Sequence, residues 1–497
     1  MTVTSPGRTL DRFDISPILG DPAFRSDHNT RHAYVAGAMG KGIASEEWVI
    51  RLARAGILGF FGAGGLPINR IGSAIRRIRA AIAPGQPFGI NFLHNPLLPA
   101  QEEELTELLL AEDVHSIEAS AFIRVTPALV HYRLAGLHVA DGIPRPVNRL
   151  MAKLSRPEVA RQFFAPPDPA IVAELLQSGR ITQDEARLAA HIPLADDVCA
   201  EADSGGHTDR RVAFTLVPHF RRLRDEIAAL NGLTQRVRIG AAGGLGTPDA
   251  IAAAFMLGAD FVLTGSINQC TPEAGISDTA KDMLAQADLA DFDIAPAGDM
   301  FEIGAKVQVL KRGTLFPGRA NRLYELYRTS AGLHDIPPAT IKEIEDRYLG
   351  RDFGAVWQET ANFYAASAPD QLAEAEANPR KKMAMIFRWY FIHSSRLAID
   401  GRADQRANFQ IHSGPAMAAA NRWLKDSVLE DWRARHVDTL ADRLMTEASS
   451  LFADRLRTLM TWDAGNPATQ TEPVGQTEPV RQTEPVRRTE PVRRTSA

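Results

Sequence analysis

Residues 33 to 270 alternate between two hydrophobic periods, and this alternation limits the possible folds more than any other feature of the chain. Short apolar segments of strand length are each followed by a helical pattern or an irregular connection. Eight such strands over about 240 residues match the number and size of a (β/α)₈ barrel, so we predict an α/β TIM barrel. The expected strands are 33–39, 58–64, 88–95, 115–122, 148–154, 196–203, 236–242 and 260–266.

One connection is longer than a simple barrel requires. Residues 155–196, between the fifth and sixth expected strands, contain PDPAIVAELLQSGRITQDEARLAAHIP. This stretch has its own helical periodicity and is expected to form a helical hairpin. Segments inserted after barrel strands lie at the face that holds the active site, so the insert is a candidate lid, with surface decoration as the alternative.

The remaining chain divides by composition. Strand signals end near residue 320, and segments such as KKMAMIFRWYFIHSSRLAI predict a helical C-terminal region at 320–462. We therefore expect an N-terminal segment at 1–32, the barrel with its insert at 33–319, and a tail at 463–497. The tail repeats TEPV every six residues. Regular prolines prevent long helices and one valine per repeat cannot build a core, so the tail is expected to be disordered.

The charge balance and the cysteines exclude several classes of protein. The 56 Lys and Arg residues are nearly balanced by 60 Asp and Glu residues, for a net charge of −4, so nothing favours nucleic acid or a membrane surface as a partner. No run approaches the roughly 20 apolar residues of a membrane helix. The start MTVTSPGRTLDRF lacks the apolar segment of a signal peptide. Cys199 and Cys270 form no C-x-x-C, so we expect a cytoplasmic protein without a disulfide framework or a metal site.

Glycines follow the seventh and eighth expected strands. The seventh ends in AAGGLGTPDA, where Thr247 can cap the next helix and Pro248 suits its first turn. The eighth ends in TGS. Backbone N–H groups at a helix start favour an anion, and barrels often hold a phosphate after these two strands, so we predict a phosphate site here. Glycines used only for tight turns are the alternative.

A Rossmann dinucleotide loop is a further interpretation of GAAGGLG at 240–246. That fold requires an acidic residue at the end of the following strand, to bind the ribose. The following strand instead ends Leu263-Thr264-Gly265-Ser266, and six strands precede the glycines. The sequence therefore favours the barrel.

The sixth expected strand ends in EADSGGHTD, where a serine and two glycines, all small residues, are followed by a histidine. The run from Asp203 to Gly206 lets the backbone turn sharply and approach a bulky group. His207 then stands at the mouth of the barrel, where an imidazole can donate or accept a proton near neutral pH. We therefore predict His207 as a catalytic residue, with a purely structural histidine as the alternative.

These motifs resemble those of a known family. EADSGGHTD is similar to the E-x-x-G-G-H signature of flavin-dependent barrels that include nitronate monooxygenases and FMN-dependent enoyl-ACP reductases. Within that group, NRLMAKLSRPEVARQFFAPP, ITQDEARLAAHIPLADDVCAEADSGGHTD and IHSGPAMAAANRW resemble segments of the PfaD family, the trans-acting enoyl reductases of polyketide and polyunsaturated fatty acid synthases. The resemblance covers about residues 10–460.

The resemblance implies FMN at the barrel mouth. The phosphate would lie on Gly243, Gly244, Gly265 and Ser266, and the ring against Gly37, Ala38 and Met39 with Asn91 and Lys153 nearby. Asp203, Gly205, Gly206 and Ala242 complete the implied cofactor set. Ordinary core packing for Met39, a turn cap for Asn91 and a surface ion pair for Lys153 are the alternatives.

The implied reaction has two halves. NADPH or NADH reduces the flavin, which then passes hydride to the β-carbon of an enoyl thioester carried by an acyl carrier protein. His207 would supply the proton or a hydrogen bond to the thioester carbonyl. A homodimer is compatible with the resemblance. The alternatives are a nitronate monooxygenase on the same barrel and a non-catalytic subunit that docks on a synthase.

A carrier protein is usually acidic, so basic surfaces are candidate docking sites. The expected helix at 67–82 offers one cluster of arginines and that at 211–230 another, and the insert is a third candidate. The arginines are Arg70, Arg76, Arg77, Arg79, Arg221, Arg222 and Arg224.

Overall fold

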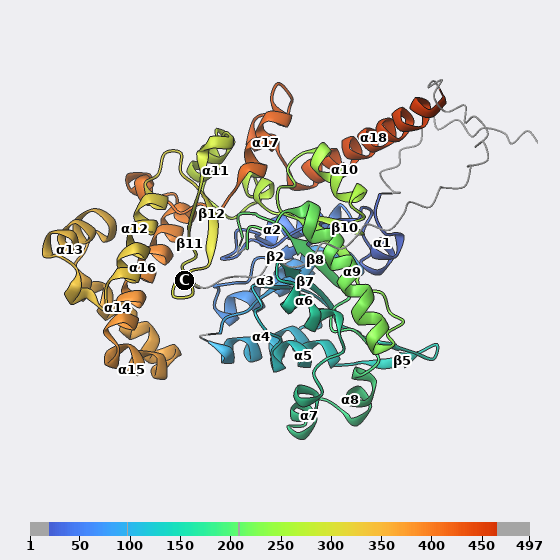
Figure 1. The fold of residues 1–497 in the computed structure, drawn as a ribbon, viewed down its shortest axis with the longest axis horizontal. Coiled ribbons are helices and arrows are strands. Elements are labelled where there is room, and N and C mark those ends of the chain that lie inside the picture. Colours follow the sequence, from blue (N-terminus) through green and yellow to red (C-terminus); the bar gives the residue numbers. More distant parts are fainter. Residues whose placement is uncertain (1–18, 97, 207–208, 465–497) are drawn as a thin grey trace, which may run out of the picture. The chain divides into compact units, whose positions relative to one another are not determined.

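The computed structural model describes residues 19–96, 98–206 and 209–464. Eight parallel strands close into a barrel in the order β1-β10-β9-β8-β7-β4-β3-β2, which confirms the predicted TIM barrel (Figure 1). The strands are β1 (Tyr34–Ala36), β2 (Leu58–Phe61), β3 (Gly89–Leu93), β4 (Ser116–Ser120), β7 (Arg149–Leu154), β8 (Asp197–Glu201), β9 (Arg238–Ala242) and β10 (Phe261–Thr264).

Helices surround the barrel and begin where the sequence places their caps. Ser45 Oγ accepts the backbone N–H of Trp48 at 3.1 Å, which starts the first of these helices, and Trp48 is fully buried against the sheet. Thr247 caps the helix after β9 in the same way. The surrounding helices are α2 (Glu46–Arg54), α3 (Ile68–Ala81), α4 (Pro99–Ala111), α5 (Pro127–Leu134), α6 (Pro157–Phe164), α9 (Ala213–Asn231) and α10 (Pro248–Met256).

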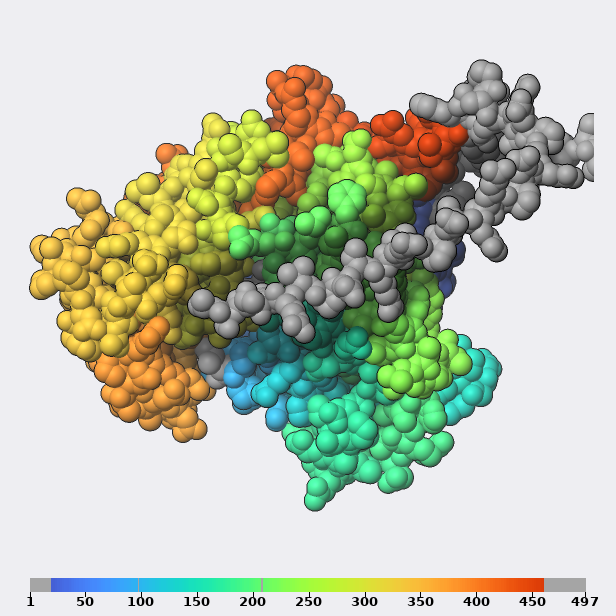
Figure 2. Space-filling view, in the orientation of Figure 1, coloured from blue at the N-terminus to red at the C-terminus, as the bar shows by residue number. Residues whose placement is uncertain are grey.

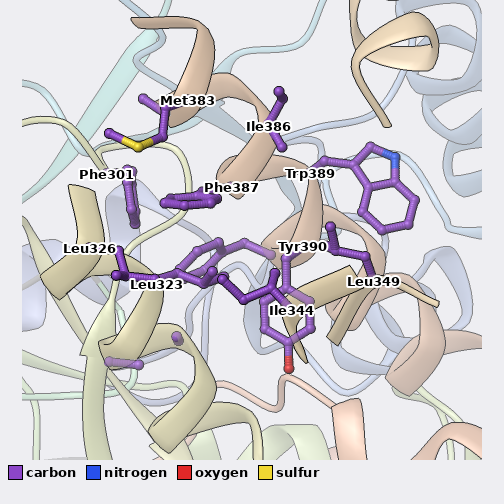
Figure 3. Close-up of a cluster of buried hydrophobic side chains, with 14 of the residues drawn as sticks. Phe301, Leu323, Leu326, Ile344, Leu349, Met383, Ile386, Phe387, Trp389 and Tyr390 are labelled. Atoms are coloured by element: carbon purple, nitrogen blue, oxygen red, sulfur yellow. The ribbon is translucent and has the colours of Figure 1, made fainter. Parts of the chain in front are cut away.

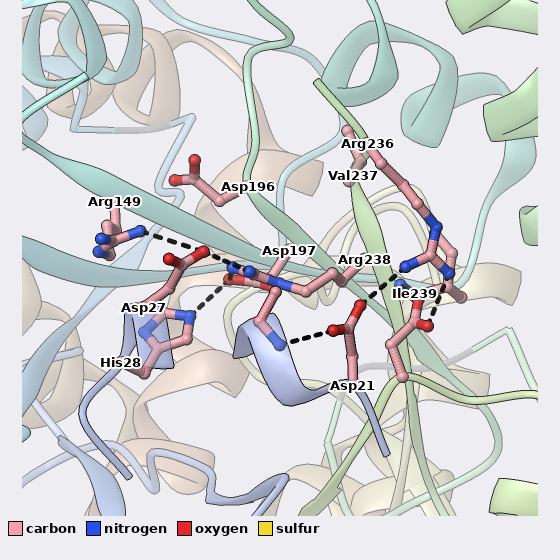
Figure 4. Close-up of polar contacts among 12 residues, drawn as sticks. Asp21, Asp27, His28, Arg149, Asp196, Asp197, Arg236, Val237, Arg238 and Ile239 are labelled. Carbon is pink, nitrogen blue, oxygen red and sulfur yellow. Dashed lines mark hydrogen bonds and ion pairs between the residues drawn. The ribbon is translucent and has the colours of Figure 1, made fainter. Parts of the chain in front are cut away.

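A buried ion-pair cluster closes the amino-terminal end of the barrel, where α1 (Pro22–Asp27) lies (Figure 4). Asp197, the first residue of β8, accepts from Arg238 Nε at 2.5 Å and contacts His28 Nε2 at 2.7 Å. Arg238 also contacts Asp27 at 2.5 Å. Burial raises the pKa of Asp197, but Arg238 and His28 outweigh burial and hold it below its usual range. The ion pairs at this end stabilise the barrel, and the carboxyl-terminal end of the strands is where TIM barrels hold their binding sites.

The helical insert is present, as predicted, but it does not form a lid. After α6, the helices α7 (Pro169–Gln177) and α8 (Gln183–Ala189) pack beside α5. None of the residues 155–196 lines the cavity described below. In the space-filling view the surface of the insert, in teal, is separated from that of residues 338–400, in yellow and orange (Figure 2). The insert therefore lies beside the barrel and does not line the cavity.

Two hairpins were not expected from the sequence. The strands β5 (His138–Ala140) and β6 (Ile143–Arg145) form a short hairpin before β7. Asp141 and Gly142 both have positive φ at its turn, which is the Asp-Gly chemistry of a type I′ turn. The second hairpin joins β11 (Phe292–Pro296) and β12 (Lys306–Leu310) and follows α11 (Asp278–Ala285).

The C-terminal region is helical, as predicted, and has its own apolar core. Phe301 and Phe387 lie at the centre of this core, with rings in edge contact and both fully buried (Figure 3). The chain up to Leu451 forms one compact unit, and a second unit starts at Phe452. The helices are α12 (Phe316–Thr329), α13 (Pro338–Ile344), α14 (Phe353–Ser367), α15 (Pro369–Ala377), α16 (Pro379–Asp400), α17 (Pro415–Leu424) and α18 (Val437–Ala464).

Two predictions concern segments that are not described. The TEPV repeats of the tail lie outside the described residues, as does His207. Within the described chain, no helix is long and apolar enough to cross a membrane.

Candidate active site

A cavity of about 1270 Å³ lies at the carboxyl end of the barrel strands. Its walls come from the loops after the strands and from α14 and α16 of the C-terminal region. Every predicted cofactor residue lines this cavity. These are Gly37, Ala38, Met39, Asn91, Lys153, Asp203, Gly205, Gly206, Ala242, Gly243, Gly244, Gly265 and Ser266. The structure therefore brings together residues from separate strand ends around the barrel.

The two glycine loops after β9 and β10 leave room for a group that approaches the backbone. Gly243 and Gly244 have φ values of +89° and +74°, which side chains rarely adopt. Apart from the adjacent residues in the chain, no described atom lies within 4 Å of a Cβ built on Gly244 or Gly265. Within the described chain, the N–H groups of Gly244 and Ser266 donate no hydrogen bond to another backbone group. Such amides beside open space at two helix starts fit a phosphate.

A buried acid–base pair lies beneath the loop after β1. Glu118 on β4 is fully buried, and its carboxylate lies 3.6 Å from Lys153 Nζ on β7. It also accepts from the backbone N–H of Ala38 at 3.2 Å and from Asn91 Nδ2 at 3.3 Å. Burial lowers the pKa of Lys153, but the carboxylates of Glu118 and Glu201 outweigh burial and raise it above its usual range. Lys153 is therefore a charged group at the cavity wall, and the surface ion pair considered above is excluded.

Glu118 and Glu201 were missed in the sequence, although a signal was present. Glu118 stands in the middle of a buried strand, in HSIEASAF, and Glu201 ends the strand in DDVCAEAD. A carboxylate in the middle of a buried strand is costly unless it is paired, so its presence indicates a polar site inside the barrel. Asn91 belongs to the same network, because its Nδ2 donates to Ser120 Oγ at 3.0 Å.

A segment from far downstream completes the cavity beside the β8 loop. Residues 411–413 pair with β12: Leu310 N donates to Ile411 O at 2.9 Å, and Val309 is bridged to His412. Gln308 Nε2 donates to Asp203 Oδ2 at 2.7 Å, and His412 Nδ1 donates to the carbonyl of Gly205 at 3.3 Å. These contacts hold the loop that leads to His207.

The glycines of these loops are required by close approach of the downstream segment. A Cβ on Gly205 would lie 3.1 Å from the Cα of Ser413, and a Cβ on Gly246 would lie 2.1 Å from the carbonyl oxygen of Ala416. Part of the glycine pattern therefore serves packing, which neither interpretation of the sequence included, while Gly244 and Gly265 face open space.

Lys41 is a second lysine at the cavity and was not predicted. It follows β1, has a φ of +58°, and its N–H donates to the carbonyl of Gly64 at 2.7 Å. Burial lowers the pKa of Lys41 to about 8, with Asp299 opposing this shift and Arg396 adding to it. A lysine with this pKa exchanges protons near neutral pH.

Among the described residues, no three His, Cys, Asp or Glu side chains cluster in a way that could hold a metal ion.

Two family models match the chain. One, described as nitronate monooxygenase, matches residues 23–312, and the other, the inserted helical domain of [acyl-carrier-protein] S-malonyltransferase, matches residues 330–409. The first match spans the whole barrel and the β11–β12 hairpin. The second lies within the C-terminal helical region.

Curated relatives come from polyketide and fatty acid synthesis. The chain is 48% identical over 442 residues to the polyketide biosynthesis protein PksE of Bacillus subtilis (strain 168), covering 89% of this chain and 57% of PksE. It is 42% identical over 417 residues to a component of the polyunsaturated fatty acid synthase of Thraustochytrium sp., covering 83% of this chain and 28% of that protein. The chain thus spans little more than half of the first relative and less than a third of the second.

Similar solved structures include an enoyl reductase domain. The enoyl reductase domain of MlnA, from the macrolactin biosynthesis cluster of Bacillus amyloliquefaciens, is 42% identical with a TM-score of 0.86, covering 89% of this chain and 99% of that one. FabK from Thermotoga maritima, at 17% identity and a TM-score of 0.51, shares the fold alone, over 88% of this chain and 98% of that one. The chain therefore belongs to the nitronate monooxygenase family, in the PfaD-like branch that its sequence resembles.

Proposed function

We propose that the chain is an FMN-dependent enoyl reductase that acts in trans on enoyl thioesters of an acyl carrier protein during polyketide or polyunsaturated fatty acid synthesis. The observation that carries this proposal is the cavity in which two open glycine loops, the Lys153–Glu118 pair and the loop that leads to His207 meet. The likeness to the MlnA enoyl reductase domain supports the type of reaction.

The residues present fit FMN. The N–H groups of Gly244 and Ser266 would hold its phosphate, and the open space beside Gly265 would admit it. Lys153 on β7 and Asn91 on β3 would contact the ring, together with Met39 from the segment after β1. When bound, FMN supplies the hydride chemistry, accepting hydride from NADPH or NADH and delivering it to the substrate.

The residues of the chain itself have to supply one proton. When hydride reaches the β-carbon of the enoyl thioester, the α-carbon must gain a proton and the carbonyl oxygen needs a donor in the transition state. We assign one of these roles to His207. Its loop is held by the contacts of Gln308 with Asp203 and of His412 with Gly205. Such positioning is what a proton donor requires.

The arginines of α3 do not support a carrier-docking face on that helix. Arg70 pairs with Glu46 at 2.5 Å, and Arg76 pairs with Glu112 at 2.6 Å. Arg77 pairs with Glu47. On α9, Arg224 is buried and donates to the carbonyl of Val237 at 3.1 Å. These side chains neutralise carboxylates or serve packing within the molecule, so the carrier partner is proposed without a docking site on α3.

The name of the matching family gives the second candidate function, a nitronate monooxygenase that passes electrons from the flavin to oxygen. The purified protein separates the two. We expect a flavin absorption spectrum, FMN on chromatography after heat release, and NADPH consumption without oxygen that depends on a crotonyl thioester. Oxygen-dependent turnover of a nitronate with no response to the thioester would favour the second candidate. Recovery of FAD, or of no flavin from folded protein, would overturn the cofactor assignment.

The role of His207 has its own measurement. In His207→Ala, stopped-flow reoxidation by the thioester should slow by about 10²–10⁴-fold, because a positioned proton donor contributes about that much. Flavin reduction by NADPH should change far less. Equal slowing of both half-reactions would show that His207 only positions its loop.

A further inference from the structure

The cavity is larger than one ligand needs. Ligand pockets usually have volumes of about 300–1,000 Å³, whereas this cavity measures about 1270 Å³. The glycine loops after β8, β9 and β10 line one part of it. The rest extends between α3 and α4 of the barrel and α14 and α16 of the C-terminal region. We call this part the outer limb.

The walls of the outer limb carry large apolar side chains from both regions. Three come from the barrel side and three from the helical side: Leu66, Ile68 and Leu105, and Phe363, Trp389 and Ile392. Phe363 is 56% exposed and Ile392 is 46% exposed, although both face a cavity and not a flat surface. Apolar side chains that converge on a cavity and keep this much open area favour an apolar occupant.

The helical wall is braced in place. The guanidinium of Arg351 lies 4.9 Å from the ring centroid of Trp389, and its Nη1 donates to Glu359 Oε2 at 2.9 Å. On the same helix as Trp389, the His393 ring stacks on the indole with centroids 4.5 Å apart. The buried core beneath α14 and α16 supports these side chains (Figure 3). A wall held in this way can discriminate between ligands of different length.

We propose that the outer limb binds the acyl chain of the enoyl thioester, and that Phe363 and Ile392 set the chain length that fits. This proposal rests on the proposed function, because it names the substrate end that the limb receives. The limb is continuous with the end of the cavity assigned to the flavin, where the double bond must lie. Its apolar side chains suit a hydrocarbon, whereas Arg388 and Arg396 of α16, which also line the cavity, could bind the phosphates of a dinucleotide, so the nicotinamide donor is the competing occupant that the test must distinguish.

The test compares short and long substrates. Steady-state kinetics with crotonyl- and trans-2-octenoyl-N-acetylcysteamine give a ratio of kcat/KM values. Each buried methylene contributes about 0.8 kcal/mol, or about fourfold, so the wild-type ratio should favour octenoyl by more than about tenfold. In Ile392→Trp the ratio should fall at least tenfold. Phe363→Trp, a change at a position that is already 56% exposed, should shift the ratio in the same direction.

A matched control is available on another helix. Phe214 on α9 is 68% exposed and does not line the cavity. Phe214→Ala should leave the ratio and both kcat/KM values unchanged. Calorimetric titration of the protein with saturated octanoyl and butyryl thioesters gives a readout without turnover. The Kd of the octanoyl ligand should rise about tenfold in Ile392→Trp, and that of the butyryl ligand should rise much less.

Two kinds of outcome would overturn the proposal, and a third would refute the proposed function instead. An unchanged ratio of kcat/KM values in both tryptophan variants, or an equal loss of kcat/KM for both chain lengths, would show that the outer limb does not bind the acyl chain. A rise confined to the KM for NADPH would assign the limb to the nicotinamide donor. Absence of turnover of any enoyl thioester by the wild type would refute the proposed function instead. The calorimetric titrations would then show by themselves whether the outer limb binds the acyl chain.

Discussion

Nζ of Lys153 lies 3.6 Å from Oε2 of Glu118, at the centre of the barrel and close to the backbone of Ala38. The two side chains come from adjacent strands, and both are largely shielded from solvent, at 13% and 0% exposure. A buried pair of this kind is costly to break from one side, because the remaining charge is left without a partner.

The first prediction concerns that pair. Lys153→Met should lower the free energy of unfolding by about 3–5 kcal/mol, since Glu118, whose pKa is raised by burial, then loses the cation that opposes this shift. The double variant Lys153→Met/Glu118→Gln should recover much of this loss. Urea unfolding of the wild type, both single variants and the double variant gives the coupling energy. Additive single effects would show that the two charges do not stabilise each other.

The second prediction separates ligand binding from folding at the glycines. Gly265→Val places a side chain in open space, although its backbone (φ −128°, ψ −75°) lies outside the α and β regions, so the melting temperature of the flavin-free protein should fall less than in Gly243→Val. Flavin content should fall strongly, because the side chain would occupy the space expected for the phosphate. Gly243→Val is the contrasting variant, since its Cβ would lie 2.4 Å from the carbonyl oxygen of Ala202 and should destabilise the fold itself. Full flavin content in folded Gly265→Val would contradict the phosphate site.

The third prediction concerns the opposite end of the barrel. Asp197→Asn should cost about 3–5 kcal/mol at pH 7, because the buried Arg238 loses its buried carboxylate partner and keeps only Asp27, which is partly exposed. The folded pKa of Asp197 is lowered, so the stability it contributes is present above its unfolded pKa of about 3.9 and is lost as the pH falls toward the folded value. The difference between variant and wild type should therefore shrink below about pH 4.

Urea unfolding between pH 3 and 7 checks this prediction. Asp346→Asn is a control on the surface, where the carboxylate is 59% exposed beside Lys342. It should change the free energy of unfolding by less than about 0.5 kcal/mol at every pH. A difference between Asp197→Asn and wild type that grows in acid would have the wrong sign.

The fourth prediction concerns Lys41, whose pKa is lowered to about 8 by burial. Above pH 8 most Lys41 side chains should be neutral and therefore nucleophilic. Labelling by an amine-reactive reagent, followed by peptide mass mapping, should give a half-maximal rate near pH 8. An ordinary lysine peptide, with a pKa of about 10.4, should reach this point more than two pH units higher. Coincident profiles would show that Lys41 is not perturbed.

The sequence predicted the barrel because its hydrophobic periods report local burial. Each strand and its following helix carry their own pattern, and the glycines at the ends of β9 and β10 stand where barrels bind phosphate. The phosphate site was predicted from these glycines, whereas the contacts of Met39, Asn91 and Lys153 with the flavin ring came from the resemblance to flavin-dependent barrels. The roles assigned to them, and to His207, stay predictions.

Other parts of the site depend on pairings that no local pattern encodes. His412 reaches Gly205 only because residues 411–413 pair with β12, far earlier in the chain. Glu118 carried a local signal, a carboxylate in a buried strand, but its partner Lys153 lies on another strand. The insert was expected over the site because of its position after a strand, whereas its helices pack beside α5.

The pairing of His412 with β12 also sets an order of events during synthesis. A nascent chain that has left the ribosome up to Thr264 already contains all eight barrel strands. It still lacks the hairpin and the later segment that hold the loop between Asp203 and Gly206. The barrel can therefore close before its mouth is finished, and a ligand of that mouth meets a complete wall only once translation has passed Ala416.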